Sequence, residues 1–307
     1  RFETSTIRGA VVQEYSYRPR AWKLNAIRND PYDYHLGVEL ETDNYAMDRA
    51  TGGRIQSRIT NEQAAGMRLP KMLWVAKRDG SVSGPEFVSH PATLSYWQAN
   101  TTKLSKMFKM LVHSGFRSHD NDHAGMHVNI SKNAFEDSRH LFRFLTLIHG
   151  NAAWSLKMSQ RTNASAEQWA SLTYLADETR RQSEVDRVMP DDNSTAPYWQ
   201  RGSTRRYQAL NCPTGQGRFE FRLPRGTLRI DRFMKNLEWT VGMIEFARNA
   251  PLYEMTSLSF MRYAQTNRRL YPNLVKFLDE RFPALTTSGT LAAGPDVTAS
   301  VVPGDGT

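Results

Sequence analysis

The stretch YDYHLGVELETDNY, residues 32–45, alternates apolar and polar side chains over its central part. Alternation with a period of two is typical of a β-strand with one buried face. Leu36, Val38 and Leu40 fall on one face, whereas Glu39 and Glu41 fall on the other. The pattern therefore predicts a strand that packs against a core on one side and presents two carboxylates on the other.

Three further stretches extend this strand into a sheet. MLWVAKRDGSVSGPEFVSH, residues 72–90, places an Asp-Gly turn between two apolar runs, which indicates a β-hairpin. GMHVNIS, residues 125–131, alternates again, and residues 205–228 contain two strand-like runs around a Gly-rich turn. Strands joined by hairpins pair antiparallel, so we expect an α+β fold around an antiparallel sheet rather than a doubly wound parallel one.

Helical spacing of apolar residues fills the intervals between the strands. The strongest signal begins near Asp137 and Ser138, which are good helix N-caps. Helices are expected at about 93–114 (as one helix or two short ones), 137–156, 231–249, 254–265 and 273–281.

The chain divides into one large domain and two flanking segments. Residues 1–33 are polar, and we expect them to be an N-terminal extension. A domain then spans 34–284, with polar insertions at about 48–70 and 157–204. Residues 285–307 are rich in Gly, Thr and Ala, a composition that predicts a disordered tail.

The composition is that of a globular protein with excess positive charge. The 307 residues are 23% charged and 39% hydrophobic, with a net charge of +9. The charge suggests anionic partners, but the basic residues are scattered in pairs, and we do not expect nucleic-acid binding. No apolar run reaches about 18 residues, so no membrane span is expected. The single cysteine, Cys212, excludes an internal disulfide, suits a reducing compartment and lacks the neighbours of an activated nucleophile.

Carboxylates recur at strand positions that face away from the apolar side. Glu39 and Glu41 share one face, although two solvated glutamates on a half-exposed strand would give the same pattern. Asp79 and Glu86 lie on either side of the turn in the 72–90 hairpin, where a turn-forming Asp and a surface Glu are the alternative. Each pair is a weak signal alone, because an ordinary surface position explains it as well. Like charges on one face repel, so a nearby cation would stabilise them.

The segment RFEFR repeats the alternation with mixed charge. Arg218, Glu220 and Arg222 share a face, and the two phenylalanines between them take the other. An ordinary cross-strand ion pair would explain this pattern. A metal ligand next to two phosphate-binding cations, as nucleotide chemistry requires, would explain it equally well.

The histidines of DHAGMHVNIS, residues 122–131, are four positions apart. A zinc-binding helix would need a glutamate directly after His123, but Ala124 stands there and a glycine follows. In a strand, Gly125, His127 and Asn129 point to one face with His123, and the glycine permits a close approach to the backbone. Carboxylate oxygens with one imidazole suit Mg²⁺ or Mn²⁺, so we expect His127 to be a metal ligand and His123 a bystander.

The motifs GVELE, RDGSVSGPE, AGMHVNIS and RFEFRLPRGTL, in this order, resemble the carboxylate–amine ligase superfamily of glutamine synthetase and glutamate–cysteine ligase. The resemblance is strongest to its amidoligase family, often found in phages and bacteria, and covers about residues 35–250. It implies a glutamine synthetase-like catalytic fold over 34–284. In that fold a curved antiparallel sheet lines an active-site funnel and helices pack outside it.

The resemblance implies two divalent ions, Mg²⁺ or Mn²⁺. Their ligands would be Glu41, Asp79 and Glu86 for one ion, and Glu39, His127 and Glu220 for the other. Asp79 is shorter than the glutamate usual in the family, which would leave that ion with more water.

The resemblance also implies residues that contact ATP. These would be Ser131, Asn129 and Arg218 at the nucleotide, Arg222 at the transferring phosphate, and Arg205 and Arg206 as further cations for phosphate or substrate. Asn129 stands where glutamine synthetase has a second histidine.

The implied activity is that of an ADP-forming, ATP-dependent carbon–nitrogen ligase. ATP would convert a carboxylate to an acyl phosphate, and an amine would displace the phosphate to give an amide. The acid and amine would belong to a peptide, an amino acid or cell-wall material. The implied location is the cytoplasm, or a virion if the protein is phage-encoded. A phosphagen-kinase-like phosphotransferase and a catalytically retired structural protein remain alternatives.

Overall fold

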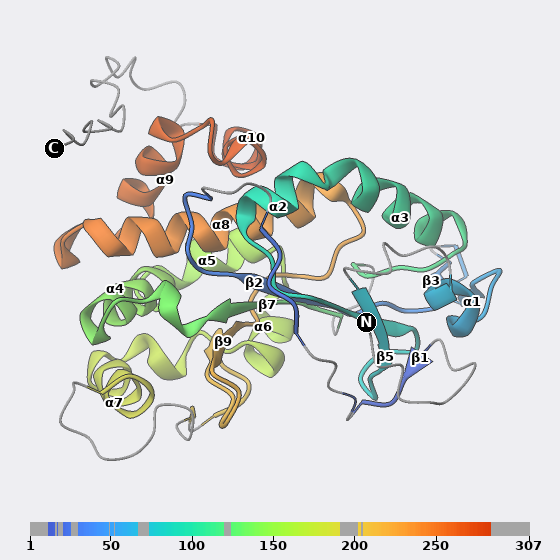
Figure 1. Ribbon diagram of the computed structural model, residues 1–307, viewed down its shortest axis with the longest axis horizontal. Coiled ribbons are helices and arrows are strands. Elements are labelled where there is room, and N and C mark those ends of the chain that lie inside the picture. Colours follow the sequence, from blue (N-terminus) through green and yellow to red (C-terminus); the bar gives the residue numbers. More distant parts are fainter. Residues whose placement is uncertain are drawn as a thin grey trace, which may run out of the picture.

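A seven-stranded mixed sheet runs through the middle of the protein (Figure 1). The computed structural model describes residues 12–15, 17, 21–25, 30–48, 50–51, 53–66, 74–119, 124–190, 202–203 and 205–283. The tail expected over 285–307 and the bystander His123 lie outside these residues. In spatial order the strands are β1 (Val12–Gln13), β5 (Trp74–Arg78), β6 (Pro85–Ser89), β2 (Leu36–Leu40), β7 (Met126–Ser131), β9 (Arg218–Phe221) and β8 (Leu210–Asn211).

The strand predicted from residues 32–45 is confirmed as β2, which lies in the centre of the sheet. It pairs antiparallel with β6 on one side and with β7 on the other. The 72–90 hairpin forms β5 and β6, and the pairs β7–β9 and β8–β9 are antiparallel as well. These pairs confirm the expected α+β class.

The expectation of a purely antiparallel sheet is wrong at one edge, where β1 runs parallel to β5. An antiparallel hairpin is forced only when a short turn joins two strands. A long stretch of chain separates Val12–Gln13 from β5, so this short segment can enter the edge in either direction.

Helices occupy all the expected positions and some others, and the range 93–114 contains two helices, one of the two alternatives expected there. The helices are α1 (Asn61–Gly66), α2 (Leu94–Ala99), α3 (Thr101–His113), α4 (Ser138–His149), α5 (Ala152–Ser159), α6 (Asn163–Trp169), α7 (Glu178–Val188), α8 (Ile230–Asn249), α9 (Ser257–Thr266) and α10 (Pro272–Arg281). Asp137 caps α4 by accepting a hydrogen bond from the His140 N–H, as predicted. The single helix expected over 137–156 is wrong, because α4 ends at Gly150 and α5 begins after Asn151.

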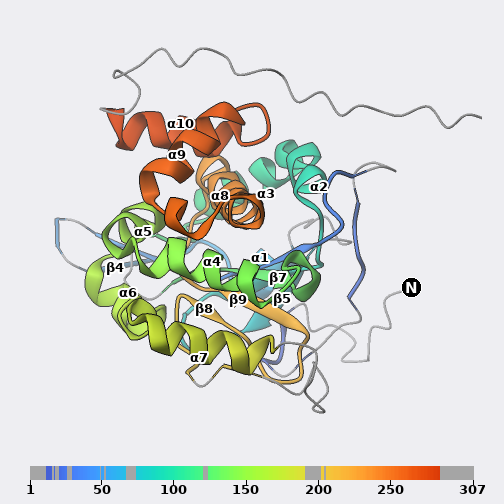
Figure 2. The same ribbon diagram turned by 90° about the vertical axis from the view of Figure 1, so that its left-hand side faces the viewer.

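Helix α8 packs against the apolar face of the sheet, and α9 and α10 pack against the side of α8 that faces away from the sheet (Figure 2). The Trp239 ring lies 5.2 Å from that of Phe221 on β9, and the Phe233 ring lies 6.2 Å from that of Trp74 on β5. All four side chains are buried. Burying a large apolar side chain of this kind contributes about 1.5–3 kcal/mol to folding.

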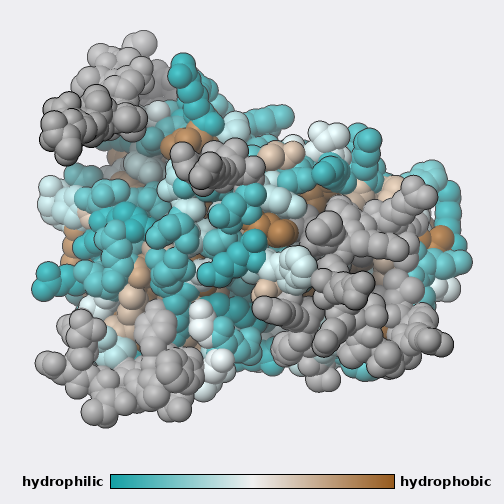
Figure 3. Space-filling model, viewed as in Figure 1, coloured by the Kyte–Doolittle hydropathy of each residue, from teal (hydrophilic) through white to brown (hydrophobic). Residues whose placement is uncertain are grey.

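The two ranges predicted to be insertions, 48–70 and 157–204, contain small elements outside the main sheet. Over the first range lie β4 (Arg54–Gln56), whose side chains are exposed, and α1; β4 pairs with β3 (Tyr45–Met47), which precedes the range. The second range contains α6, α7 and the 3₁₀ turn Tyr174–Ala176. The face seen in Figure 3 is mainly hydrophilic, with scattered hydrophobic residues. In the described part of the chain, none of the helices combines the length and apolar character of a bilayer span.

Candidate metal centre

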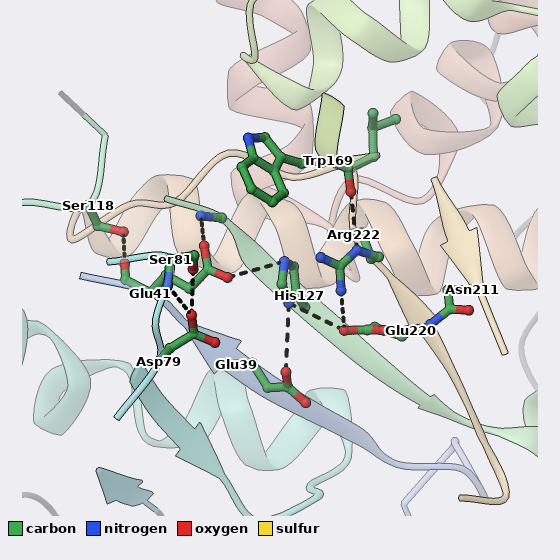
Figure 4. A network of polar contacts seen from close by, with 12 residues as sticks. Glu39, Glu41, Asp79, Ser81, Ser118, His127, Trp169, Asn211, Glu220 and Arg222 are labelled. Carbon is green, nitrogen blue, oxygen red and sulfur yellow. Dashed lines mark hydrogen bonds and ion pairs between the residues drawn. The ribbon is translucent and has the colours of Figure 1, made fainter. Parts of the chain in front are cut away.

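Carboxylates from neighbouring strands meet around one imidazole on the face of the sheet opposite α8 (Figure 4). Glu39 on β2 is paired in register with His127 on β7, and Asn129 on β7 is paired with Glu220 on β9. Glu41 directly follows β2, and Glu86 lies on β6. The ladder register thus brings together side chains that are up to 181 positions apart in the chain.

The first group consists of Glu39, His127 and Glu220. Nδ1 of His127 lies 3.7 Å from Oε2 of Glu39 and 3.3 Å from Oε1 of Glu220. One ligand atom from each residue falls within 4.8 Å of the others. This spacing is compatible with a single ion between them.

The second group consists of Glu41, Glu86 and the same His127. Nε2 of His127 lies 3.6 Å from Oε1 of Glu41, and the Gly125 N–H donates to Oε2 of Glu41 at 2.5 Å. A Cβ at position 125 would lie 2.5 Å from Nη2 of Arg161 and 3.0 Å from Nε2 of His127. A larger residue here would displace the Arg161 side chain, so the close approach expected at this glycine is observed.

Two arginines and two amides hold the first group in place. Arg218 Nη2 lies 3.3 Å from Glu39 Oε1, and Arg222 Nη1 lies 2.7 Å from Glu220 Oε1. The Asn129 side chain donates to Glu39 at 2.9 Å, and the Asn211 side chain donates to Glu220 at 2.8 Å. Each carboxylate therefore has one cationic and one neutral donor, which fixes its orientation.

The two groups differ in their electrostatics. Burial alone would raise the pKa of Glu39, but contact with His127 and the charge of Arg218 outweigh it and hold the pKa below its usual range. Burial raises the pKa of Glu86 well above its usual range, and the negative charges of Glu39, Asp79 and Glu41 add to this effect. Glu86 is thus more readily protonated than a solvated glutamate, whereas Glu39 is less so.

The donor atoms suit a divalent ion. His127 Nδ1 is buried and has no hydrogen-bond partner among the described residues, although it faces two carboxylates. Carboxylate oxygens with one imidazole form a ligand set that Mg²⁺ and Mn²⁺ accept. A cation between the carboxylates would also offset the repulsion between them.

A cleft of about 700 Å³ opens beside the metal centre. Glu39, Glu86 and Glu220 lie in its wall. Its lining also includes cations and polar residues from several segments, namely Lys23, Lys77, Arg206, Arg218, Asn129 and Ser131. Cations beside a group of carboxylates allow the cleft to hold an anionic ligand together with its metal ion.

Arg206 and Ser131, two of the residues predicted to contact ATP, lie in this cleft. Nη2 of Arg206 donates to the hydroxyl of Tyr15 at 3.1 Å, and Tyr15 also lines the cleft. The hydroxyl of Ser131 donates to the His35 carbonyl at 3.0 Å. Both residues are therefore positioned beside the space that a ligand would occupy.

Arg205 and Asp79 are placed differently from the other predicted residues. The Arg205 guanidinium lies 3.9 Å from the centre of the Tyr174 ring, and Arg205 does not line the cleft. Asp79 lies in the 79–84 loop, and its Oδ1 accepts from the N–H and the hydroxyl of Ser81. Asp79 belongs to neither group of candidate ligands among the described residues, although its charge acts on Glu86.

Two residues of the site were not predicted, Arg161 and Asn211. Arg161 is buried beside Gly125, and its side chain donates to the Leu223 carbonyl and to the Ser165 hydroxyl. It follows Gln160, which ends α5 in the left-handed conformation, and no sequence pattern indicates this position. Asn211 on β8 reaches the site because it pairs in register with Glu220 on β9, and this pairing is visible only in the structure.

Neither a protein-family model nor a curated protein sequence matches the chain. Among solved structures, the chain is similar to the complex between the prokaryotic ubiquitin-like protein Pup and its ligase PafA, with a TM-score of 0.35 and 12% identity. The similarity covers 81% of this chain and 58% of that chain. At this TM-score two proteins need not share a fold, so the site is interpreted from its own residues.

Proposed function

We propose that the protein is an ATP-dependent carboxylate–amine ligase that forms ADP, phosphate and an amide. The observation that carries the proposal is one buried imidazole between two groups of carboxylates, beside a cleft lined with cations. Phosphoryl transfer is catalysed mainly by metal ions and fixed cations placed around the phosphates. The arrangement offers candidate ligands for such ions and fixed cations for the phosphates.

Glu39, Glu220 and His127 would hold one Mg²⁺ or Mn²⁺ ion, and Glu41 and Glu86 would hold the other. When bound, the ions neutralise the phosphate charge and align the γ-phosphoryl group with its acceptor. Asn129 and Asn211 orient the carboxylates of the first group. Asp79 would contribute to the binding of the second ion through its charge or through a bridging water molecule.

In the first step, an oxygen of the substrate carboxylate forms a bond to the γ-phosphorus and the bond to the β-phosphate oxygen breaks, which releases ADP. In the second step, the amine nitrogen bonds to the acyl carbon, phosphate leaves, and the nitrogen loses a proton. Arg222 would stabilise the charge on the transferring phosphoryl group, and Arg218 and Arg206 the remaining phosphates. Ser131 would contact the nucleotide.

No covalent protein nucleophile is needed for this chemistry. Cys212 lies in the cleft wall, but burial raises the pKa of its thiol, which disfavours the reactive thiolate. A route through an acyl phosphate on the substrate therefore agrees better with the residues of the cleft than a thioester route.

The test uses carboxylates labelled with ¹⁸O together with hydroxylamine, which intercepts acyl phosphates as hydroxamates. A panel of amino acids, peptides and cell-wall-type acids is incubated with the protein, ATP and Mg²⁺. A ligase is expected to yield hydroxamate, ADP and phosphate carrying one ¹⁸O atom from the carboxylate. The Glu220→Gln variant is the matched control, because it keeps the size of the side chain and removes its charge.

Other outcomes of this experiment contradict the proposal. AMP and pyrophosphate would indicate adenylation of the acid. A stable phosphorylated product without hydroxamate would indicate a phosphagen-kinase-like phosphotransferase. Failure to bind ATP with Mg²⁺ in calorimetry would indicate a retired enzyme with a structural role.

A further inference from the structure

Arg218 and Arg222 lie two residues on either side of Glu220, yet their guanidinium groups have different surroundings. Arg222 is buried, and besides its contact to Glu220 it donates through Nε to the Trp169 carbonyl at 3.2 Å. Arg218 has 26% of its side chain exposed and lines the cleft. Of the two, Arg218 is therefore the more accessible to a ligand in the cleft.

Arg218 and a metal ion would compete for the Glu39 carboxylate, of which Arg218 contacts the oxygen Oε1. It accepts from Nδ2 of Asn129 at 2.9 Å and lies 3.3 Å from Nη2 of Arg218. Asn129 is neutral, whereas Arg218 and a divalent ion would both be held by the negative charge of this carboxylate. An ion in the first group therefore weakens the attraction between Glu39 and Arg218.

One nitrogen of Arg218 lacks a hydrogen-bond partner. Nε and Nη2 donate to the Gln216 side chain at 3.1 and 2.8 Å, whereas Nη1 is buried and has no hydrogen-bond partner among the described residues. A guanidinium pairs well with two phosphate oxygens because its donors are planar and parallel. A phosphate in the cleft would thus be a suitable second partner for Arg218.

We propose that Arg218 exchanges partners, neutralising Glu39 when no metal is bound and moving to a nucleotide phosphate when the ion takes over Glu39. This inference rests on the proposed function, because it takes a divalent ion and a nucleotide as the ligands. The exchange couples the two binding events, so each ligand strengthens the binding of the other by the same factor. Arg218 is the residue that carries this coupling.

The first experiment measures Mn²⁺ binding by calorimetry with and without ADP. Arg218→Gln removes the competing cation, so nucleotide-free Mn²⁺ binding is expected to tighten about fivefold or more while the gain on adding ADP shrinks. Lys77→Gln is the matched control, because it removes one positive charge from the same cleft and Lys77 pairs in register with Glu86 rather than Glu39. Equal tightening in both variants would show a general field effect and would overturn the proposal.

The second experiment measures ADP binding in the presence of a chelator. Glu39→Gln releases Arg218, so metal-free ADP binding is expected to strengthen about fivefold or more, even though Mn²⁺ binding is lost. Glu86→Gln changes a carboxyl group in the same cleft wall without releasing an arginine, and a smaller gain is expected. An equal gain in both variants would contradict the exchange.

Circular dichroism and thermal unfolding establish that the four variants remain folded. If the wild-type protein binds neither Mn²⁺ nor ADP, the proposed function fails and the exchange fails with it. If the wild type binds both ligands but each test variant has the same affinities as its control variant, the exchange alone is wrong.

Discussion

On β9, Phe219 and Phe221 point into an aromatic core, whereas Glu220 between them points into the metal centre. The Phe219 ring lies 5.2 Å from that of Phe135, and the Phe221 ring lies 5.2 Å from that of Trp239. Glu220 contacts Asn211 and Arg222 instead. Packing on the apolar side is non-directional, while each contact on the polar side depends on one particular partner.

The difference between the faces has an energetic consequence. Truncating an apolar residue removes buried area and leaves a cavity, which costs stability. Neutralising a carboxylate in a group of like charges removes repulsion along with its favourable contacts, so its effect on stability is small. We therefore expect the apolar face to govern stability and the polar face to govern chemistry.

Glu220→Gln gives the largest expected effect and tests the polar face. The amide keeps the shape of the carboxylate but removes the charge that a divalent ion and Arg222 require. The rate of metal-dependent ADP release from ATP, measured with a coupled assay, is expected to fall at least about a thousandfold. This corresponds to an activation barrier about 4 kcal/mol higher. The midpoint of thermal unfolding should stay within a few degrees, and a large drop there would contradict the separation of the two faces.

Phe221→Ala is the counterpart on the next residue of the same strand. Phe221 is fully buried against Trp239 and Phe144, so truncation is expected to cost about 3–4 kcal/mol in the free energy of unfolding. Denaturant unfolding measures this loss. A cost below about 1 kcal/mol would mean that the core face is not packed as described.

His149→Gln tests how the helical layer beside the core responds to acid. Burial lowers the pKa of His149 to about 4, while an unfolded histidine titrates near 6.5. The unfolded state thus binds the proton first, and the fold loses about 2 kcal/mol between pH 7 and pH 5 on account of this group. The variant can keep the hydrogen bond to the Leu172 carbonyl and should lose less stability over this range.

The acid response of His149→Gln is measured by chemical unfolding at several pH values. Part of the loss should persist in the variant, because burial also lowers the pKa of His140 to about 4. An unchanged pH profile would mean that His149 is protonated to the same extent in the folded and unfolded states.

Asn211→Ala is expected to have the smallest effect, and it refines the account of the polar face. It removes the amide that orients Glu220 but leaves the carboxylate in place. Mn²⁺ affinity is expected to fall about tenfold, the lower end of what loss of such a supporting contact costs. Unchanged affinity in a calorimetric titration would assign the orientation of Glu220 to Arg222 alone.

The sequence was most informative where a strand has one apolar and one polar face. Alternation placed Leu36, Val38 and Leu40 on the core side of β2 and Glu39 on the other side, as observed. The same reasoning placed His127 and Glu220 correctly, because the period of two is a local property of the strand.

Features that depend on distant parts of the chain could not be predicted in this way. The parallel entry of β1 depends on where a long connection returns to the sheet. The break between α4 and α5, by contrast, has a local signal, because Gly and Asn, here Gly150 and Asn151, commonly end a helix. Arg161 reaches the metal centre from the segment after α5, and only the folded chain brings it near Glu41. Arg205 was predicted from its place next to Arg206, but their side chains diverge toward Tyr174 and Tyr15.

The position of β2 between β6 and β7 has a further consequence for how such a protein can change over time. Glu39 and His127 lie on strands paired on both sides, whereas Arg206, Tyr15 and Lys23 reach the cleft from segments at its rim. Substitutions at the rim can alter which molecule enters without disturbing the ladder that aligns the carboxylates. The proposed reaction centre could thus be adapted to new substrates while its innermost strands stay unchanged.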